Sequence, residues 1–321
     1  MKQGEGMKAE FSGSDFWKNY MVRWFGKELI DKWAMYAELV QIDSVGGKIN
    51  AEVYRNTDSG KPVIVFAHGI AGYARVLLPF LIPLYEKGYN IVAPDLEGFG
   101  YNGRIKGDYT WNTHLRNLKD TVDYARSQFQ GPVFLGGASM GGPLVYAADA
   151  RYNCADALIC WCLWNLSDRE FLKKETTTKG LTPLLLPLFR LAASVFGKLR
   201  VKTYSFISYD TLTDSSEFNN LLKTDPQAGT SISLRGALSL VTQAVPDIMY
   251  ENYSKPVLLC QPEGDRMIPP VYSRRTFGRL KSEQKKYYGF EGPHFPLERK
   301  IYSRWADCVD RFIEEYGNIA L

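Results

Sequence analysis

The sequence lacks any apolar run long enough to cross a bilayer. A membrane-spanning helix needs roughly 20 consecutive apolar residues, and no stretch of this chain approaches that length. The first residues, Met1 to Ser14, are polar and rich in glycine. They contain no apolar core of the kind that a signal peptide requires, so we expect neither a signal peptide nor a membrane-spanning segment.

A strong excess of charge of one sign is also missing. The chain has 39 basic and 35 acidic residues, which gives a formal net charge of +4. An excess this small and this scattered does not favour a nucleic acid as partner. Hydrophobic residues make up 45% and charged residues 23% of 321 positions. These values are ordinary for a soluble globular protein, and the length allows a large core.

Cysteine and histidine are scarce, with five and three residues respectively. Cys160 and Cys162 are two positions apart, so on a strand they would share a face, but no second Cys/His pair lies at the spacing of a zinc site. Most of the cysteines fall in apolar, strand-like segments. We therefore expect buried free thiols, no metal and no cofactor, and a reducing, cytoplasmic location.

What the sequence does contain is an alternation of apolar β-branched runs with segments of helical period. This alternation predicts an α/β fold, with a mostly parallel twisted sheet flanked by helices. Gly46-Gly47 between the first two strands favours an antiparallel hairpin at one edge. The expected strands span 37–43, 48–55, 62–67, 90–94, 133–136, 155–163, 256–261 and 286–290. The expected helices span 75–87, 108–130, 270–280 and 297–316, with a further short helix just after Ser139.

The alternation is interrupted in the middle of the chain. Prolines, a Lys/Thr-rich patch and the apolar segment 181–196 predict an inserted helical cap at 165–245. The core then comprises 37–164 and 246–321, preceded by an N-terminal segment, 1–36. Aromatic residues recur there at three- and four-residue intervals from Phe16 to Phe25, which predicts an aromatic helix face after a Ser14 cap. Docking against the core or cap is the ordinary explanation for such a face, and contact with a membrane surface is the alternative.

The strongest chemical signal is Gly137-Ala138-Ser139-Met140-Gly141. This G-x-S-x-G sequence follows a buried strand and precedes a helical segment, which is where a nucleophilic serine on a strained strand-to-helix turn is found. The glycines allow the flanking chains to approach each other, and the helix N-terminus favours developing negative charge. A glycine-rich turn with a helix-capping serine is the alternative explanation, because short motifs also occur by chance.

A serine nucleophile needs a base and an acid behind that base. His294 lies in a turn-rich loop after the last expected strand, whereas His114 falls within a helix and His68 in a loop where a bracing role is expected. Asp265 follows the strand 256–261 and falls between Ser139 and His294, which gives the order Ser, acid, His expected for such a site. Glu263 is the nearest competitor and is ranked below Asp265. A turn aspartate without a catalytic role is the alternative for Asp265.

Acyl transfer also requires donors for the oxyanion of the tetrahedral intermediate. The backbone N–H of Met140, the residue after the predicted nucleophile, is one candidate. The loop after strand 62–67 supplies the other, where Gly69 lets the backbone come close to the substrate and Ile70 offers its amide.

These residues resemble the α/β-hydrolase superfamily, and within it the monoacylglycerol lipase/lysophospholipase and serine aminopeptidase-like branch. The resemblance rests on His68-Gly69-Ile70, on the segment 95–100, and on GASMGG, EGDRMIP and the GPH turn. It covers the core and not the cap. It implies the α/β-hydrolase fold, the roles of Ser139, Asp265 and His294, and the oxyanion hole at Ile70 and Met140. Phe99 departs from the branch, whose members commonly carry a histidine there.

The resemblance and the apolar segment 181–196 together suggest a substrate. We expect a serine carboxylic-ester hydrolase acting on a small-molecule ester with a medium or long hydrophobic acyl group, without a cofactor. The segment 181–196 has one charged residue, Arg190, and it lines the acyl pocket or packs inside the cap. A thioesterase, a small-amide or peptide hydrolase, and a ligand-binding protein with little turnover remain alternatives. The oligomeric state is left open by the sequence.

Overall fold

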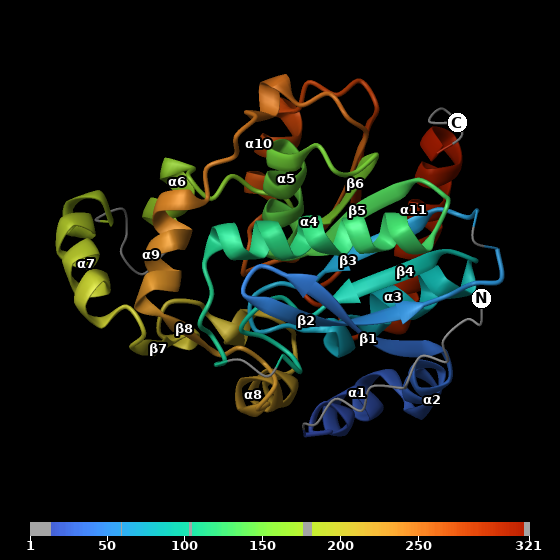
Figure 1. Cartoon of the computed structure of the whole chain (residues 1–321), viewed down its shortest axis with the longest axis horizontal. Helices are drawn as coiled ribbons and strands as arrows, with labels where there is room; N and C mark the ends of the chain where they lie inside the picture. The colour runs from blue at the N-terminus through green and yellow to red at the C-terminus, as the bar shows by residue number, and fades with distance from the viewer. Residues whose placement is uncertain (1–13, 59, 103–104, 176–181, 318–321) are drawn as a thin grey trace.

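The computed structural model describes residues 14–58, 60–102, 105–175 and 182–317. Its centre is an eight-stranded sheet in the order β1-β2-β4-β3-β5-β6-β9-β10 (Figure 1). The first two strands pair antiparallel with each other, β2 is antiparallel to β4, and the others are parallel. The strands are β1 (Ala37–Ser44), β2 (Gly47–Tyr54), β3 (Val63–Ala67), β4 (Asn90–Pro94), β5 (Val133–Ala138), β6 (Ala157–Trp161), β9 (Val257–Pro262) and β10 (Lys285–Phe290).

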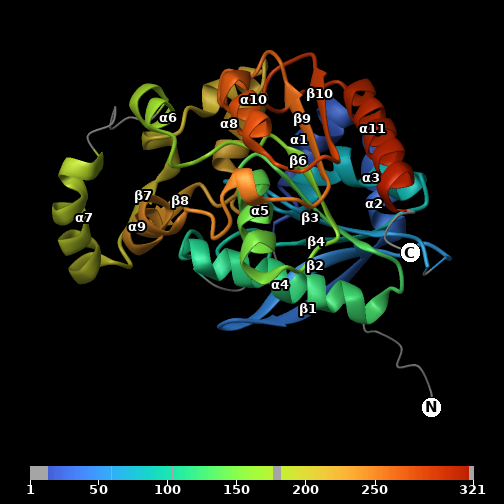
Figure 2. The same ribbon diagram turned by 90° about the horizontal axis from the view of Figure 1, so that it is seen from above.

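Helices cover both faces of this sheet, so the fold predicted from the alternating pattern is confirmed. One face carries α3 (Leu78–Glu86) and α11 (Arg299–Gly317), and the other carries α4 (Trp111–Gln128) and α5 (Gly141–Tyr152) (Figure 2). A further helix, α10 (Pro270–Arg279), packs beside β9. The central strands β3, β5 and β6 are buried along their whole length, as expected for parallel strands with both faces covered.

The expected helix at 75–87 differs from the structure at its start. A 3-10 turn over Ala74–Leu77 leads into α3, whose first turn contains a proline. The expected helix at 108–130 begins later, because the Thr110 hydroxyl accepts the Thr113 N–H at 3.2 Å and so caps α4. Both differences concern boundaries, which capping and local hydrogen bonds decide.

The segment between β6 and β9 forms a layer beside the sheet's carboxyl edge. It contains α6 (Arg169–Lys174), α7 (Thr182–Phe196), α8 (Ser216–Thr224) and α9 (Leu234–Gln243). It also contains the short antiparallel strands β7 (Arg200–Lys202) and β8 (Ser231–Ser233), and short 3-10 turns at Thr203–Ser205, Tyr209–Thr211 and Tyr250–Asn252. The sequence did not predict the two strands, because three residues are too few to show a period-two pattern. The segment predicted as a helical cap thus contains a two-stranded sheet as well as helices.

The N-terminal segment forms α1 (Trp17–Phe25) and α2 (Lys27–Tyr36), separated by Gly26, whose φ of 84° is readily adopted by glycine. The aromatic face predicted for this segment is present on α1. Its buried members, Trp17, Tyr20, Met21 and Phe25, are at most 1% exposed. This face packs inward against the rest of the protein, which is the arrangement expected for docking. In the described part of the chain, no helix has the length and apolar character to cross a bilayer.

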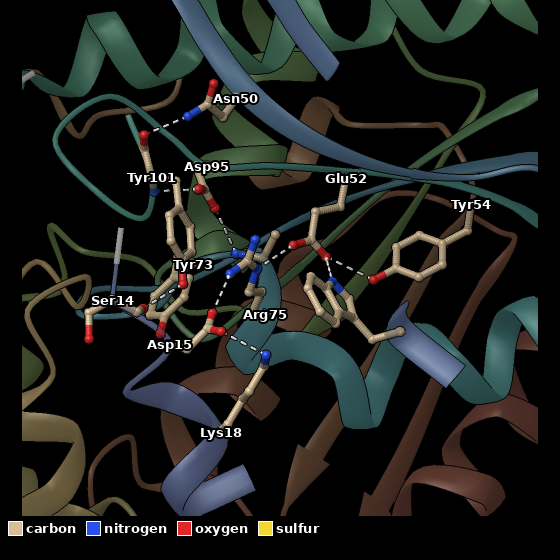
Figure 3. Close-up of polar contacts among 12 residues, drawn as sticks. Ser14, Asp15, Lys18, Asn50, Glu52, Tyr54, Tyr73, Arg75, Asp95 and Tyr101 are labelled. Carbon is tan, nitrogen blue, oxygen red and sulfur yellow. Dashed lines mark hydrogen bonds and ion pairs between the residues drawn. The ribbon is translucent and has the colours of Figure 1, made fainter. Parts of the chain in front are cut away.

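Arg75, in the 3-10 turn before α3, links this N-terminal segment to the sheet (Figure 3). It is 3% exposed, and its Nε donates to Glu52 Oε1 of β2 at 3.0 Å. Its Nη1 lies 3.6 Å from Asp15 Oδ1, and its guanidinium lies 3.9 Å from the centre of the Tyr101 ring. Burial raises the pKa of Glu52, but the charge of Arg75 acts in the opposite direction. A buried cation with these partners requires the N-terminal segment to cover it.

Candidate active site

Ser139 lies in the tight turn between β5 and α5. Its φ of 57° is in the left-handed region, and its backbone N–H donates to the Trp161 carbonyl at 2.8 Å. A Cβ at Gly137 would come within 2.5 Å of the Gly141 backbone, so a side chain there would force the turn apart. The strained backbone and the close approach are the features that the G-x-S-x-G sequence predicted.

The structure brings His294 and Asp265 together from two separate loops. His294 Nδ1 lies 2.6 Å from Asp265 Oδ2, and the two residues are only 3% and 4% exposed. The other carboxylate oxygen, Oδ1, accepts the backbone N–H groups of Met267 and Ile268 at 2.8 Å each. Because Nδ1 donates to the carboxylate, Nε2 of the neutral imidazole is left as a proton acceptor.

The rival residues have other partners. Glu263 is engaged by Arg274 and by the Tyr287 hydroxyl, which donates to Glu263 Oε1 at 2.9 Å. His114 lies in α4, where its Nε2 is 2.9 Å from the Glu97 carbonyl oxygen. Burial lowers the pKa of His114 to about 3, so this side chain is neutral near pH 7. Neither residue is placed to act with Ser139.

His68 braces the loop after β3, as the sequence suggested. Its Nε2 accepts the Leu96 N–H at 3.0 Å, and its Nδ1 lies 2.8 Å from the Gly69 carbonyl oxygen. These contacts fix the tautomer with the proton on Nδ1. Burial lowers the pKa of His68 to about 4, which keeps the ring neutral near pH 7.

That loop passes directly over the serine. A Cβ on Gly69 would lie 2.8 Å from Ser139 Cβ and 3.1 Å from its Oγ, so only glycine fits without displacement. The following residue, Ile70, and Met140, which follows Ser139, line the same cavity as Ser139. The two residues predicted to donate oxyanion N–H groups are therefore brought to the predicted nucleophile, while their role stays a prediction.

Ser139 and His294 open onto a cavity of about 950 Å³ between the sheet and the cap. This volume is at the upper end of the range for small-molecule sites. The walls come mainly from apolar side chains of both layers, including Trp164, Phe171, Leu186, Phe189, Phe206, Phe218 and Leu240. The apolar segment predicted as a lid contributes Leu185, Leu186 and Phe189 to these walls.

Two residues beside the histidine and the acid were missed by the sequence analysis. The Trp161 indole N–H donates to the His294 carbonyl at 3.0 Å and holds the histidine loop against β6. Cys162 Sγ lies 3.6 Å from Asp265 Oδ2. Cys162 does not share a strand face with Cys160, because β6 ends at Trp161 and Cys162 has a φ of 71°. No sequence signal marks this turn out of the strand.

The Cys162 thiol also belongs to a group of side chains that could bind a metal ion. Among the described residues, one group of potential ligands is found, and its atoms, from Cys162, Asp265 and His294, lie within 4.8 Å of one another. Two of these atoms are already joined by the 2.6 Å hydrogen bond of the histidine and the carboxylate. A cation there would have to break that bond, so the chemistry of the group fits proton transfer better than metal binding.

A buried hydrogen-bonded junction joins the N-terminal helix, the loop after β3 and the cap. Asp225, directly after α8, is 2% exposed and accepts the Tyr20 and Tyr73 hydroxyls, each at 2.7 Å on Oδ2. Nearby, the Phe218 ring of α8 stacks 5.8 Å from the ring of Phe295, the residue after His294. Helix α1 thus contributes to the frame around the cavity.

Comparison with known proteins supports the fold and identifies the family. The model of the serine aminopeptidase S33 family matches residues 58–293. The quorum-quenching protein AidA of Acinetobacter baumannii is 33% identical over 272 residues, which is 78% of this chain and 85% of that protein.

Two solved structures are similar in shape at low identity. The monoacylglycerol lipase of Paleococcus ferrophilus has a TM-score of 0.67 at 18% identity, over 83% of this chain and 98% of that one. A thermostable carboxyl esterase of Bacillus coagulans has a TM-score of 0.70 at 15% identity, over 88% and 99%. These likenesses show the fold. With the family match over most of its length, and with a strand-to-helix serine that lines the same cavity as His294, the chain belongs to the serine aminopeptidase S33 family of α/β-hydrolases.

Proposed function

We propose that this protein is a serine hydrolase that cleaves a carboxylic ester through an acyl-enzyme intermediate. The observation that carries the proposal is the buried His294–Asp265 pair at 2.6 Å, opening onto the same cavity as Ser139. A serine, and a histidine that is hydrogen-bonded to a carboxylate, are the nucleophile and the base that acyl transfer uses. Lipases and esterases among the structural neighbours support ester hydrolysis as the reaction type.

In the proposed mechanism, His294 Nε2 takes the proton of Ser139 as Oγ attacks the acyl carbon. Asp265 holds Nδ1–H and stabilises the imidazolium. The backbone N–H groups of Ile70 and Met140 stabilise the oxyanion. The imidazolium then protonates the leaving alcohol as the C–O bond breaks. In the second half, His294 activates a water molecule, which releases the acid and restores the serine.

The cavity suggests a medium or long hydrophobic acyl group. Its apolar walls, with Leu186 and Phe189 from α7 and Phe218 from α8, would exclude water from a hydrocarbon chain. Charged side chains among its lining residues are few, namely Lys174, Glu175 and Arg266. A lining with so few charged side chains favours an uncharged ester over a peptide, whose charged ends would have to leave water to enter it.

The test is hydrolysis of p-nitrophenyl esters from acetyl to palmitoyl by the wild type and by Ser139→Ala. We expect a maximum at one chain length and a fall in kcat of at least about 10³-fold in the variant. Ser167→Ala is the matched control, because Ser167 lines the same cavity and has no predicted catalytic role.

Each outcome bears on a different part of the proposal. Activity that survives in Ser139→Ala would exclude Ser139 as the nucleophile. If the wild type is inert towards every ester, acyl thioesters and small amides are tested next with the same pair of variants. Stoichiometric labelling without turnover would instead favour the ligand-binding alternative.

A second candidate role comes from the relative that is named for quorum quenching. Removal of a bacterial signalling molecule would be one use of a hydrolase with an apolar cavity. A quorum-sensing reporter strain exposed to the wild type should lose its signal, and the Ser139→Ala protein should leave the signal unchanged. Loss of signal with both proteins would contradict a hydrolytic origin of the effect.

A further inference from the structure

Helix α7 is apolar on two opposite faces. Leu186, Phe189 and Ala193 follow one another at three- and four-residue steps and turn inward, where the first two line the cavity. Leu184, Leu188, Leu191 and Val195 follow the same period on the other side, and they are 78%, 68%, 63% and 64% exposed. A soluble globular protein normally places polar residues on the outer face of such a helix.

The outward face lies at the extremity of the molecule. Figures 1 and 2 both place α7 at the outer end of the cap, farthest from the central sheet. Phe196 and Leu199, at the end of the helix and just beyond it, are 62% and 60% exposed and extend the apolar surface. We call Leu184, Leu188, Leu191, Val195, Phe196 and Leu199 the α7 surface. Nothing in the described part of the chain covers it.

The charges along this stretch of the chain are of one sign. Residues 176–209 contain five basic residues, Lys179, Arg190, Lys198, Arg200 and Lys202, and no aspartate or glutamate. Because the whole chain has a formal charge of +4, all other residues together sum to −1. The four basic residues within the described part are exposed. The excess positive charge of the protein is thus concentrated in the stretch of chain that contains α7.

We propose that the α7 surface docks this protein onto an anionic lipid surface. An apolar helix face flanked by basic side chains combines the two contributions that hold a peripheral protein on such a surface, which are burial of apolar area and attraction to anionic headgroups. Helix α7 is too short to cross a bilayer, so the helix lies in the interface.

The position of the α7 surface also connects it to the cavity. The same helix turns Leu186 and Phe189 towards the space above Ser139, so a docked α7 places the cavity wall one helix diameter from the lipid. An apolar ligand could then pass from the lipid into the cavity without crossing bulk water. The docking itself does not depend on the reaction proposed for Ser139.

The experiment measures co-sedimentation of the full chain with phosphatidylglycerol vesicles and with phosphatidylcholine vesicles. The test variant is Leu188→Gln with Leu191→Gln, which leaves the residues lining the cavity unchanged. Met35→Gln is the matched control, because Met35 is 72% exposed on α2, away from the cap. A second variant, Arg190→Gln with Lys198→Gln, removes charge and keeps the apolar face.

We expect binding to phosphatidylglycerol vesicles and a fall in the partition coefficient of roughly ten-fold for the double leucine variant. Met35→Gln should bind as the wild type does. The charge variant should lose affinity for phosphatidylglycerol and respond less to added salt.

Three results would overturn the proposal: no binding to anionic vesicles, equal binding of the wild type and the leucine variant, or a wild-type dimer that the leucine variant converts to a monomer. The last result, from light scattering, would mean that a second copy covers the α7 surface. Hydrolysis of a soluble butyryl ester is measured for every variant and should not change. Absence of that hydrolysis in a wild type that still binds vesicles would contradict the proposed function and leave the docking intact.

Discussion

Helices α1 and α7 are both rich in large apolar residues, yet the fold uses them in opposite ways. Trp17, Tyr20 and Phe25 of α1 are almost completely buried, whereas Leu184 and Leu188 of α7 are 78% and 68% exposed. From sequence, α1 was the helix for which a membrane surface was considered, and α7 was expected to line the pocket or pack inside the cap. The structure buries α1 and gives α7 an inward and an outward face.

The difference lies in the partners available to each helix. The aromatic rings of α1 meet rings from elsewhere in the fold, such as Trp17 against Trp33 at 5.1 Å and Tyr20 against Phe218 at 5.2 Å. Helix α7 packs on α9 along one side, and its other side faces outward at the end of the cap (Figure 1). The amphipathic pattern identifies a helix and its apolar face, but the surrounding fold decides what that face contacts.

The largest effect expected from this comparison is on stability. Trp17→Ala should lower the free energy of unfolding by about 3–5 kcal/mol, because it leaves a cavity beside Trp33 and Arg75. Leu188→Ala on α7 should change it by no more than about 0.5 kcal/mol, since the side chain is already in water. Urea denaturation of both variants measures the difference. Similar values for the two would contradict the contrast between the helices.

A smaller effect is expected from pH. Burial lowers the pKa of His114 from 6.5 to about 3, so between these values the unfolded chain binds a proton that the native protein does not. The contribution of His114 to stability therefore falls as the pH drops below 6.5, by about 2 kcal/mol between pH 7 and pH 5. His114→Gln should lose correspondingly less stability over this range.

Vesicle binding through α7 should not share the pH dependence of stability, because the helix contains no histidine and no acidic residue. Partition to phosphatidylglycerol vesicles should thus be nearly the same at pH 7 and pH 5 while the protein stays folded.

For the His114 experiment, a stability difference between the wild type and His114→Gln that does not change with pH would contradict the neutral state assigned to the His114 imidazole.

The smallest effect concerns the polar junction of α1. Tyr20→Phe removes one of the two hydroxyls that Asp225 Oδ2 accepts, and should cost about 1–2 kcal/mol of unfolding free energy. Arg23→Gln, which breaks an exposed ion pair between α1 and Glu217 of α8, should cost less than about 0.5 kcal/mol. Equal costs for both would mean that the buried junction adds nothing beyond a surface contact.

Much of the core could be predicted because its signals are local. The Gly46-Gly47 turn, the buried runs of β3 and β5 and the glycines around Ser139 each depend on residues that are neighbours in the chain. The Ser, Asp, His order then identified loops that parallel strands bring to one edge of the sheet. The structure places Asp265 and His294 in contact, while their catalytic role stays a prediction.

Other features depend on which distant segments meet. Nothing local to Asp225 announces two tyrosine partners about 150 and 205 residues away, and nothing local to Cys162 shows that its thiol faces Asp265. The strands β7 and β8 are too short to leave a pattern. Their pairing follows from the packing of the cap.

By itself, the sequence determined the alternation of strands and helices, the strained serine turn, the aromatic face of α1 and the apolar character of α7. Only the tertiary structure decided that the face of α1 is buried and that one side of α7 is exposed. The reason is that periodicity and turn chemistry act over a few residues, whereas burial depends on the surfaces that the folded chain brings together.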